Sequence, residues 1–232
     1  DGLTDAYGVT TDRFCSGAIP IGPPNRVTAD RVFLIGDAAA QTIEYLTTDC
    51  WTGDAFASSQ GGDPEYYTLE PTDREEADAP PIDDTVFADR NGLAIDGLLT
   101  FAAYTDDERA LRYAERTREH VVETLVEDGA VSHYASEAAP TGLLVDQARL
   151  LAGLTSSWQV QGEPGPARAV ADWTLEHLQA ESGAFVDGPT EGAGLLDRPL
   201  YPLDTTVELA DELLTLSLLT GDEDYREAAE RA

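Results

Sequence analysis

Acid–base chemistry needs side chains that exchange protons and that a substrate can reach. His133 and Asp187 are the best candidates in this sequence. Each ends a short segment that opens on Gly and continues as a half-apolar strand, 129–133 and 183–187. Further acids lie on or beside such segments: Asp54, Asp146 and Asp204. Neighbouring carboxylates and an imidazole can donate and accept protons. We predict that His133 and Asp187 are catalytic; the alternative is that these acids cap helices and solvate a surface with 45 acidic residues.

Aromatic side chains near the same segments could bind a ligand by stacking. Phe56 ends a third Gly-led segment, 53–56, and Tyr66 and Tyr67 follow a Gly- and Asp-rich turn. We predict that these three residues contact substrate. No two His stand at metal-ligand spacing, and Cys15 and Cys50 form no C-x-x-C pair, so no metal site is expected.

The elements that would position these residues are helical. Apolar residues recur at helical spacing over 84–106, 142–157 and 203–219, and a second helix follows each of them, from 108, from 166 and from 223. The turns at Thr105, Gly162 and Thr220 are 57 and 58 residues apart. Such a period predicts a repeat of helical hairpins. Gly-led segments between stacked hairpins are typical of the open face of a helical toroid, where a ligand would bind.

The charge of the chain excludes several classes of partner. The formal net charge is −31, and all 14 basic residues are Arg. Such a surface repels phosphate, so neither nucleic acid nor an anionic membrane is expected as a partner. The sequence contains no run of 18 apolar residues, so no transmembrane helix is predicted. The acidity favours a halophilic, cytoplasmic protein, because molar salt shortens the Debye length to about 3 Å and screens the carboxylates.

Composition divides the chain near Thr42. Residues 1–42 hold five acidic residues and three Arg and are rich in Gly, Pro, Val and Ile, whereas residues 43–232 hold 40 acidic residues and 11 Arg. Strands are predicted within 13–24 and from Val32 to Ile35, with a helix starting at Ala38. We predict an incomplete β-strand segment over 1–42 and a helical domain over 43–232.

The first segment resembles part of the flavin-dependent geranylgeranyl reductase family of archaea, on RFCSGAIPIGPP (13–24) and RVFLIGDAAAQT (31–42). The resemblance implies that Asp37 would bind the ribityl chain of FAD, that Gly36 would allow close approach, and that the amides of Ala38 and Ala39 would face the pyrophosphate. The G-x-G-x-x-G of a first dinucleotide unit is absent. No cofactor is therefore expected for this chain alone, and FAD is implied only by the resemblance of residues 30–42.

The second segment is similar to the C-terminal part of the thioredoxin-like spermatogenesis-associated family. The motifs that carry the similarity are GDAFASSQGGDPEYY (53–67), DRNGLAIDGLL (89–99), GLLVDQARLLAGL (142–154) and RPLYPLDTTVELADELLTLSLLTGDEDY (198–225). The resemblance implies a mainly α fold, a partial (α/α)₆ toroid of the six-hairpin glycosidase type. It also implies sugar chemistry, by fold alone.

The sequence thus predicts a toroid fragment related to carbohydrate-active enzymes, with a sugar or another small molecule as ligand. One alternative is a flavin-dependent oxidoreductase remnant; another is a non-catalytic scaffold or a broken fusion product. An open ring would leave apolar hairpin faces uncovered, so oligomers are expected if the toroid is incomplete.

Overall fold

A computed structural model describes residues 28–29, 32–33, 43, 45–60, 64–74, 77–78, 82–162, 164–189 and 200–232. The chain divides into two units, Asp1–Phe33 and Leu34–Ala232. In the described part of the first unit, Thr28–Ala29 (β1) pairs antiparallel with Val32–Phe33 (β2). The strand expected within 13–24 and the helix expected from Ala38 lie outside the described residues.

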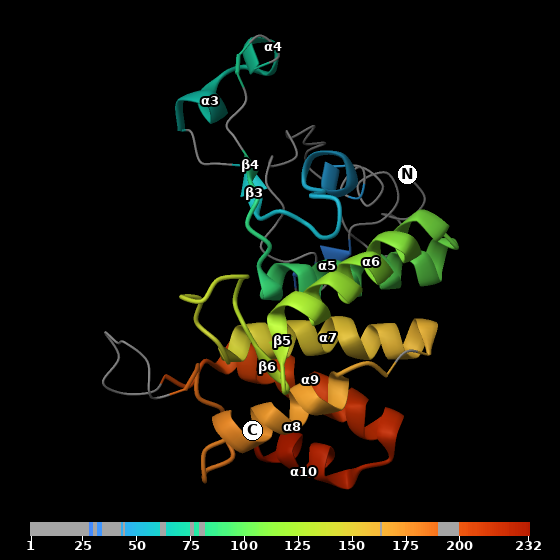
Figure 1. Ribbon diagram of the computed structural model, residues 1–232, viewed down its shortest axis with the longest axis vertical. Helices are drawn as coiled ribbons and strands as arrows, with labels where there is room; N and C mark the ends of the chain where they lie inside the picture. Colours follow the sequence, from blue (N-terminus) through green and yellow to red (C-terminus); the bar gives the residue numbers. More distant parts are fainter. Residues whose placement is uncertain are drawn as a thin grey trace, which may run out of the picture. The chain divides into compact units, whose positions relative to one another are not determined.

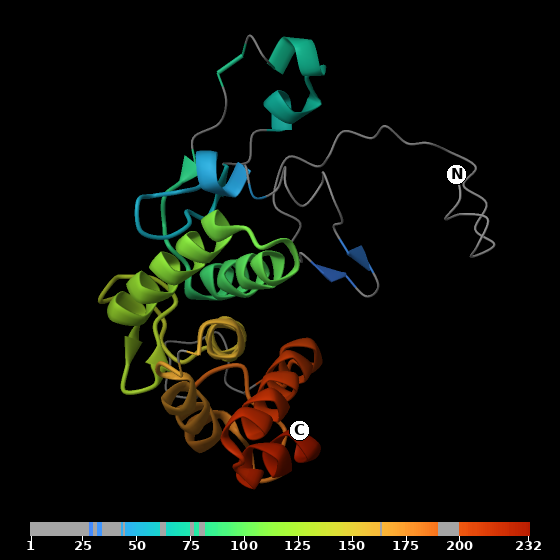
Figure 2. The ribbon, with the colours of Figure 1, turned by 90° about the vertical axis from the view of Figure 1, so that its right-hand side faces the viewer.

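The second unit is built on three consecutive helical hairpins. They are Ala88–Thr105 (α5) with Glu108–Leu125 (α6), Leu144–Gln161 (α7) with Ala167–Leu178 (α8), and Leu203–Thr220 (α9) with Glu223–Arg231 (α10). Helix α7 lies between α5 and α9 and packs on both (Figures 1 and 2). We call α5, α7 and α9 the inner helices, and α6, α8 and α10 the outer helices.

The three inner helices are alike in length and in how they end. Each has 18 residues, and each stops at a residue in the left-handed conformation, Asp106, Gly162 or Gly221. These residues are 56 and 59 positions apart, which confirms the predicted repeat of helical hairpins. The tight turn then leads into an outer helix, and Asp107 and Asp222 cap α6 and α10 by accepting backbone N–H groups.

Short elements connect the hairpins and extend the unit. Val126–Glu127 (β5) pairs with Ala130–Val131 (β6), and Ser59–Gln60 (β3) pairs with Ile82–Asp83 (β4), both antiparallel. Between β3 and β4 lie two one-turn helices, Pro64–Thr68 (α3) and Pro71–Arg74 (α4). Residues 45–49 are helical as well. None of the described helices is long and apolar enough to cross a membrane.

Two buried amides fix the Gly-led segments to the inner helices. Asn91 of α5 accepts from the Phe56 N–H and donates to the Phe56 carbonyl, both at 2.9 Å. Gln147 of α7 accepts from the Val131 N–H at 2.7 Å and donates to the Gly129 carbonyl at 3.1 Å. Asn91 and Gln147 are the fourth residues of their helices. The repeat therefore extends to the hydrogen bonds that hold one strand segment against the start of each of these helices.

Small residues let the inner helices approach closely. A Cβ added to Gly92 of α5 would lie 2.3 Å from the Arg149 carbonyl oxygen of α7, and one added to Gly153 of α7 would lie 2.8 Å from the Gly92 carbonyl oxygen. Large side chains from all three inner helices fill the core, including Ile95, Leu151 and Leu213. The predicted class, a mainly α partial toroid of hairpins, is confirmed.

Candidate functional site

The candidate site lies where the inner helices begin, at the left-hand side of Figure 1. His133 follows the β5–β6 hairpin, whose turn residues Asp128 and Gly129 both have positive φ (49° and 88°). The Ala88 N–H at the start of α5 donates to the His133 carbonyl at 2.9 Å. This bond ties His133 to the first residue of α5 and so places it beside Asp89.

His133, Asp146 and Asp89 form one cluster. The Nδ1 atom of His133 lies 3.0 Å from both carboxylate oxygens of Asp146. One potential ligand atom from each of the three residues lies within 4.8 Å of the others. An ionised carboxylate only accepts hydrogen bonds, so Nδ1 carries the proton between the two side chains and Nε2 is the ring nitrogen left for proton transfer. The cluster therefore joins an oriented imidazole to two carboxylates.

The three side chains of the cluster differ in burial. Asp146 is fully buried, whereas the His133 side chain is 26% exposed and that of Asp89 is 14% exposed. Burial raises the pKa of Asp146 to about 6, and hydrogen bonding from His133 and from the Asp89 backbone offsets part of the rise. Asp146 can thus orient His133 but cannot itself reach a ligand, while His133 and Asp89 can.

Arg149 of α7 holds Asp89 in place. Its Nη1 donates to Asp89 Oδ2 and its Nε to Glu208 Oε2 of α9, both at 3.1 Å. The clamp links all three inner helices. The second oxygen of Asp89, Oδ1, is buried and accepts no hydrogen bond from the described residues. A buried carboxylate oxygen with no partner carries an energetic cost.

The other predicted catalytic residue, Asp187, has a backbone role in the structure. Its carboxylate accepts from the Leu200 N–H at 3.1 Å, and its carbonyl accepts from the Leu144 N–H at 2.9 Å. The Asp187 carbonyl thus accepts the N–H of the first residue of α7, just as the His133 carbonyl accepts the N–H of the first residue of α5. It lies outside the cluster of Asp89, His133 and Asp146. The catalytic role predicted for Asp187 remains a prediction.

The predicted binding residues are spread over the unit. Phe56 is buried and packs edge-on to Trp51, with 5.1 Å between ring centroids. Tyr66 is half-buried on α3, and the side chain of Tyr67 lies outside the described part of the structure. Gly36, Asp37, Ala38 and Ala39 lie outside the described residues too, so the flavin prediction is untested.

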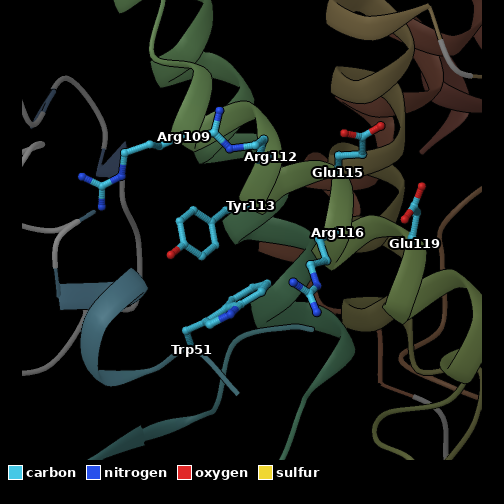
Figure 3. A pocket seen from close by; sticks show the side chains of 7 residues that line it. All are labelled: Trp51, Arg109, Arg112, Tyr113, Glu115, Arg116 and Glu119. Carbon is cyan, nitrogen blue, oxygen red and sulfur yellow. The ribbon is translucent and has the colours of Figure 1, made fainter. Parts of the chain in front are cut away.

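A separate hollow of about 710 Å³ lies along α6 (Figure 3). It is lined by two aromatic and five charged side chains, Trp51, Tyr113, Arg109, Arg112, Arg116, Glu115 and Glu119. The Arg116 guanidinium already has two partners. Its Nη2 pairs with Asp54 at 2.9 Å, and the group lies 5.9 Å from the centre of the Trp51 ring. The hollow shares no residue with the Asp89–His133–Asp146 cluster and offers no oriented acid–base pair.

Comparison with solved structures identifies the fold. An α-mannanase of glycoside hydrolase family 76 from Bacteroides thetaiotaomicron matches with a TM-score of 0.54 and 16% identity, covering 66% of this chain and 44% of the mannanase. A protein designated UGL, solved with dGlcA-Glc-Rha-Glc, matches with a TM-score of 0.60 and 17% identity, covering 84% of this chain and 53% of UGL. The second unit is a partial α/α toroid of helical hairpins, like part of the fold of these structures.

A third similar structure was solved with a bound sugar. It is an inactive variant of an α-1,6-mannanase from Salegentibacter sp., with two aspartates replaced by asparagine, in complex with α-1,6-mannotriose. The TM-score is 0.51 and the identity 15%, over 63% of this chain and 45% of the mannanase. This chain spans about half the length of the solved structures that it matches. No protein-family model and no curated protein matches the sequence.

Proposed function

We propose that the chain carries a carbohydrate site at the start of its inner helices and takes part in cleaving a glycosidic bond. The observation that carries the proposal is the cluster of an oriented His133, a buried Asp146 and a partly exposed Asp89. Glycoside hydrolysis needs one group that protonates the leaving oxygen and a second, ionised group near the anomeric carbon. The two exposed members of the cluster fit these two needs.

In this proposal His133 is the proton-transferring residue. Asp146 holds its Nδ1 at 3.0 Å and stabilises the charged ring, which is how a buried carboxylate assists a catalytic imidazole. Asp89 supplies the carboxylate, and Arg149, which donates to its Oδ2 at 3.1 Å, fixes one of its oxygens.

The similar structures support a sugar as the ligand. One is an α-1,6-mannanase variant inactivated by replacing aspartates and bound to α-1,6-mannotriose, and another was solved with dGlcA-Glc-Rha-Glc. We further propose that residues 43–232 belong with the thioredoxin-like spermatogenesis-associated family. Three motifs that carry that resemblance, 89–99, 142–154 and 198–225, cover the starts of α5, α7 and α9, where the candidate site lies.

The test is sugar cleavage by the chain and by single variants. Release of reducing ends from α-1,6-mannotriose and from a panel of other oligosaccharides should fall by about 10²–10⁴-fold in Asp89→Asn and in His133→Gln. His120→Gln on α6 and Asp224→Asn on α10 are matched controls on the outer helices, outside the cluster, and they should retain activity. Cleavage that survives in both site variants would overturn the proposal, as would a chain that neither cleaves nor binds any sugar of the panel.

A further inference from the structure

The cluster of Asp89, His133 and Asp146 has the composition of a metal site as well as that of an acid–base site. One potential ligand atom from each side chain lies within 4.8 Å of the other two. An imidazole nitrogen with carboxylate oxygens is a donor set that Zn²⁺ and its neighbours in the first transition row accept. Three protein ligands also leave one position for water, which is the pattern of an open zinc site.

The shortest distances in the cluster suit a small metal ion. Nδ1 of His133 lies 3.0 Å from each carboxylate oxygen of Asp146. Two ligands bound at about 2.1 Å are about 3.0 Å apart when they subtend a right angle, and about 3.4 Å apart in a tetrahedron. His133 and Asp146 are therefore already spaced as two neighbouring ligands of one ion.

The third residue, Asp89, is held in place by one oxygen and keeps the other uncommitted. Arg149 donates to its Oδ2 at 3.1 Å. Its Oδ1 is buried and accepts no hydrogen bond from the described part of the chain. Oδ1 is thus the oxygen that a metal ion could bind without breaking the contact with Arg149.

The charges at the start of the inner helices favour a cation. Arg149 pairs with both Asp89 and Glu208, so its single positive charge is shared between two carboxylates. Asp146 adds a third carboxylate, which is fully buried. Three ionised carboxylates and one guanidinium sum to −2 beside a neutral His133. A divalent ion would cancel that charge, and a bound ion is the largest local charge in a site of this kind.

We propose that Asp89, His133 and Asp146 bind one divalent transition-metal ion, with Zn²⁺ the best fit. The ligand atoms would be Oδ1 of Asp89, Nδ1 of His133 and one oxygen of Asp146, and the Nδ1 proton would leave to solvent as the metal binds. Mg²⁺ and Ca²⁺ fit less well, because they take oxygen ligands. The three residues are 44 and 13 positions apart, so spacing along the chain does not reveal the site.

The metal site does not depend on the proposed sugar chemistry, and the ion would be an inhibitor of that chemistry, not its cofactor. Both roles use Nδ1 of His133, which donates to Asp146 in proton transfer and would carry the ion in the metal site. In a chain that cleaves sugar, Zn²⁺ should therefore inhibit cleavage, and a chelator should restore it. In a chain that cleaves none, the binding of Zn²⁺ is still measurable.

The experiment is titration of the full chain with Zn²⁺, followed by calorimetry and by ¹H–¹⁵N NMR of the histidine rings. The His133 signals should shift and saturate at one equivalent, while those of His120 and His177 stay in place. Asp89→Asn should weaken binding by about 100-fold or more, because loss of an outer-shell partner alone costs about 10–100-fold. Asp224→Asn on α10 is the matched control and should bind Zn²⁺ as the wild type does. Mg²⁺ should leave His133 unchanged.

The titration is run in about 1 M KCl, where the Debye length of about 3 Å screens attraction to the acidic surface. Zn²⁺ that shifts no histidine, or that shifts all three alike, would overturn the proposal. So would an affinity unchanged in Asp89→Asn, or an equal response of His133 to Mg²⁺. Because the His133 side chain is 26% exposed, His133→Gln is a second variant that tests the site if Asp89→Asn fails to fold. Far-UV circular dichroism verifies the helices of each variant.

Discussion

Replacing Glu212 by Gln should stabilise the protein at neutral pH. Glu212 of α9 is half-buried, and Thr155 donates to its carboxylate at 2.5 Å. Burial raises the pKa of Glu212 from 4.5 to about 7, the Thr155 hydrogen bond offsets part of the rise, and the nearby charges of Asp96 and Asp211 add to it. Gln keeps the size of the side chain and an oxygen that accepts the Thr155 hydrogen bond, but it cannot ionise.

The magnitude follows from the pKa difference between the folded and unfolded states. One pKa unit is worth about 1.4 kcal/mol, so a rise from 4.5 to about 7 amounts to about 3 kcal/mol, and partial solvent exposure reduces this to about 2 kcal/mol. Below pH 4.5 the carboxyl is neutral in both states and costs nothing. As the pH rises towards 7, the unfolded chain ionises first, so the wild type loses stability relative to the variant.

The assay is chemical denaturation followed by circular dichroism at a series of pH values. The variant and wild type should have equal free energies of unfolding near the ordinary pKa, and the variant should be more stable by about 2 kcal/mol at neutral pH and above. Glu227→Gln in α10 is the control, since Glu227 is exposed and its replacement changes the net charge by the same amount. A stabilisation equal in the two variants, or one that persists undiminished in acid, would refute the reasoning.

Four further substitutions test the packing and one helix cap. Gly92→Ala should destabilise the protein by about 1–3 kcal/mol, because the new Cβ would meet the α7 backbone, whereas Gly97→Ala in the same helix meets nothing and should stabilise it by up to about 1 kcal/mol; equal midpoints in thermal unfolding would contradict this. Asn91→Ala leaves the Phe56 N–H and carbonyl buried without a partner and should cost about 2–4 kcal/mol in denaturant unfolding; a cost under about 1 kcal/mol would show that another group replaces the amide. Asp222→Ala removes the cap of α10 and should cost about 1 kcal/mol, with faster amide hydrogen exchange confined to that helix; unchanged exchange there would count against the cap.

Much of the fold could be predicted from local signals. The turns after Thr105, Gly162 and Thr220 set the ends of the inner helices, because a left-handed residue or an N-capping Asp leaves the backbone little choice there. The Gly-led segments were also predictable, since positive φ at Gly129 and Gly183 is a local requirement. The side chains that each helix presents to its neighbours were harder to predict.

The sequence points to only some of the residues of the candidate cluster, for a physical reason. His133 was identified because it follows a recognisable turn, and Asp146 because it enters a helix nearby. Asp89 was missed, although it stands second in α5 as Asp146 stands third in α7. In a chain with 45 acidic residues, the sequence does not tell which carboxylate is buried. That depends on the clamp by Arg149, which joins residues about 60 positions apart.

The most direct test of the central claim uses the chain's three histidines, His120, His133 and His177. Each histidine has two ring nitrogens, so ¹H–¹⁵N NMR spectra give three pairs of signals, and one pair comes from the candidate site. Titration with α-1,6-mannotriose and the wider sugar panel should shift the His133 signals while those of His120 and His177 stay in place, and Asp89→Asn should weaken the response. If every sugar leaves His133 unchanged, or if the shifts fall on the other two histidines, the Asp89–His133–Asp146 cluster is not a carbohydrate site.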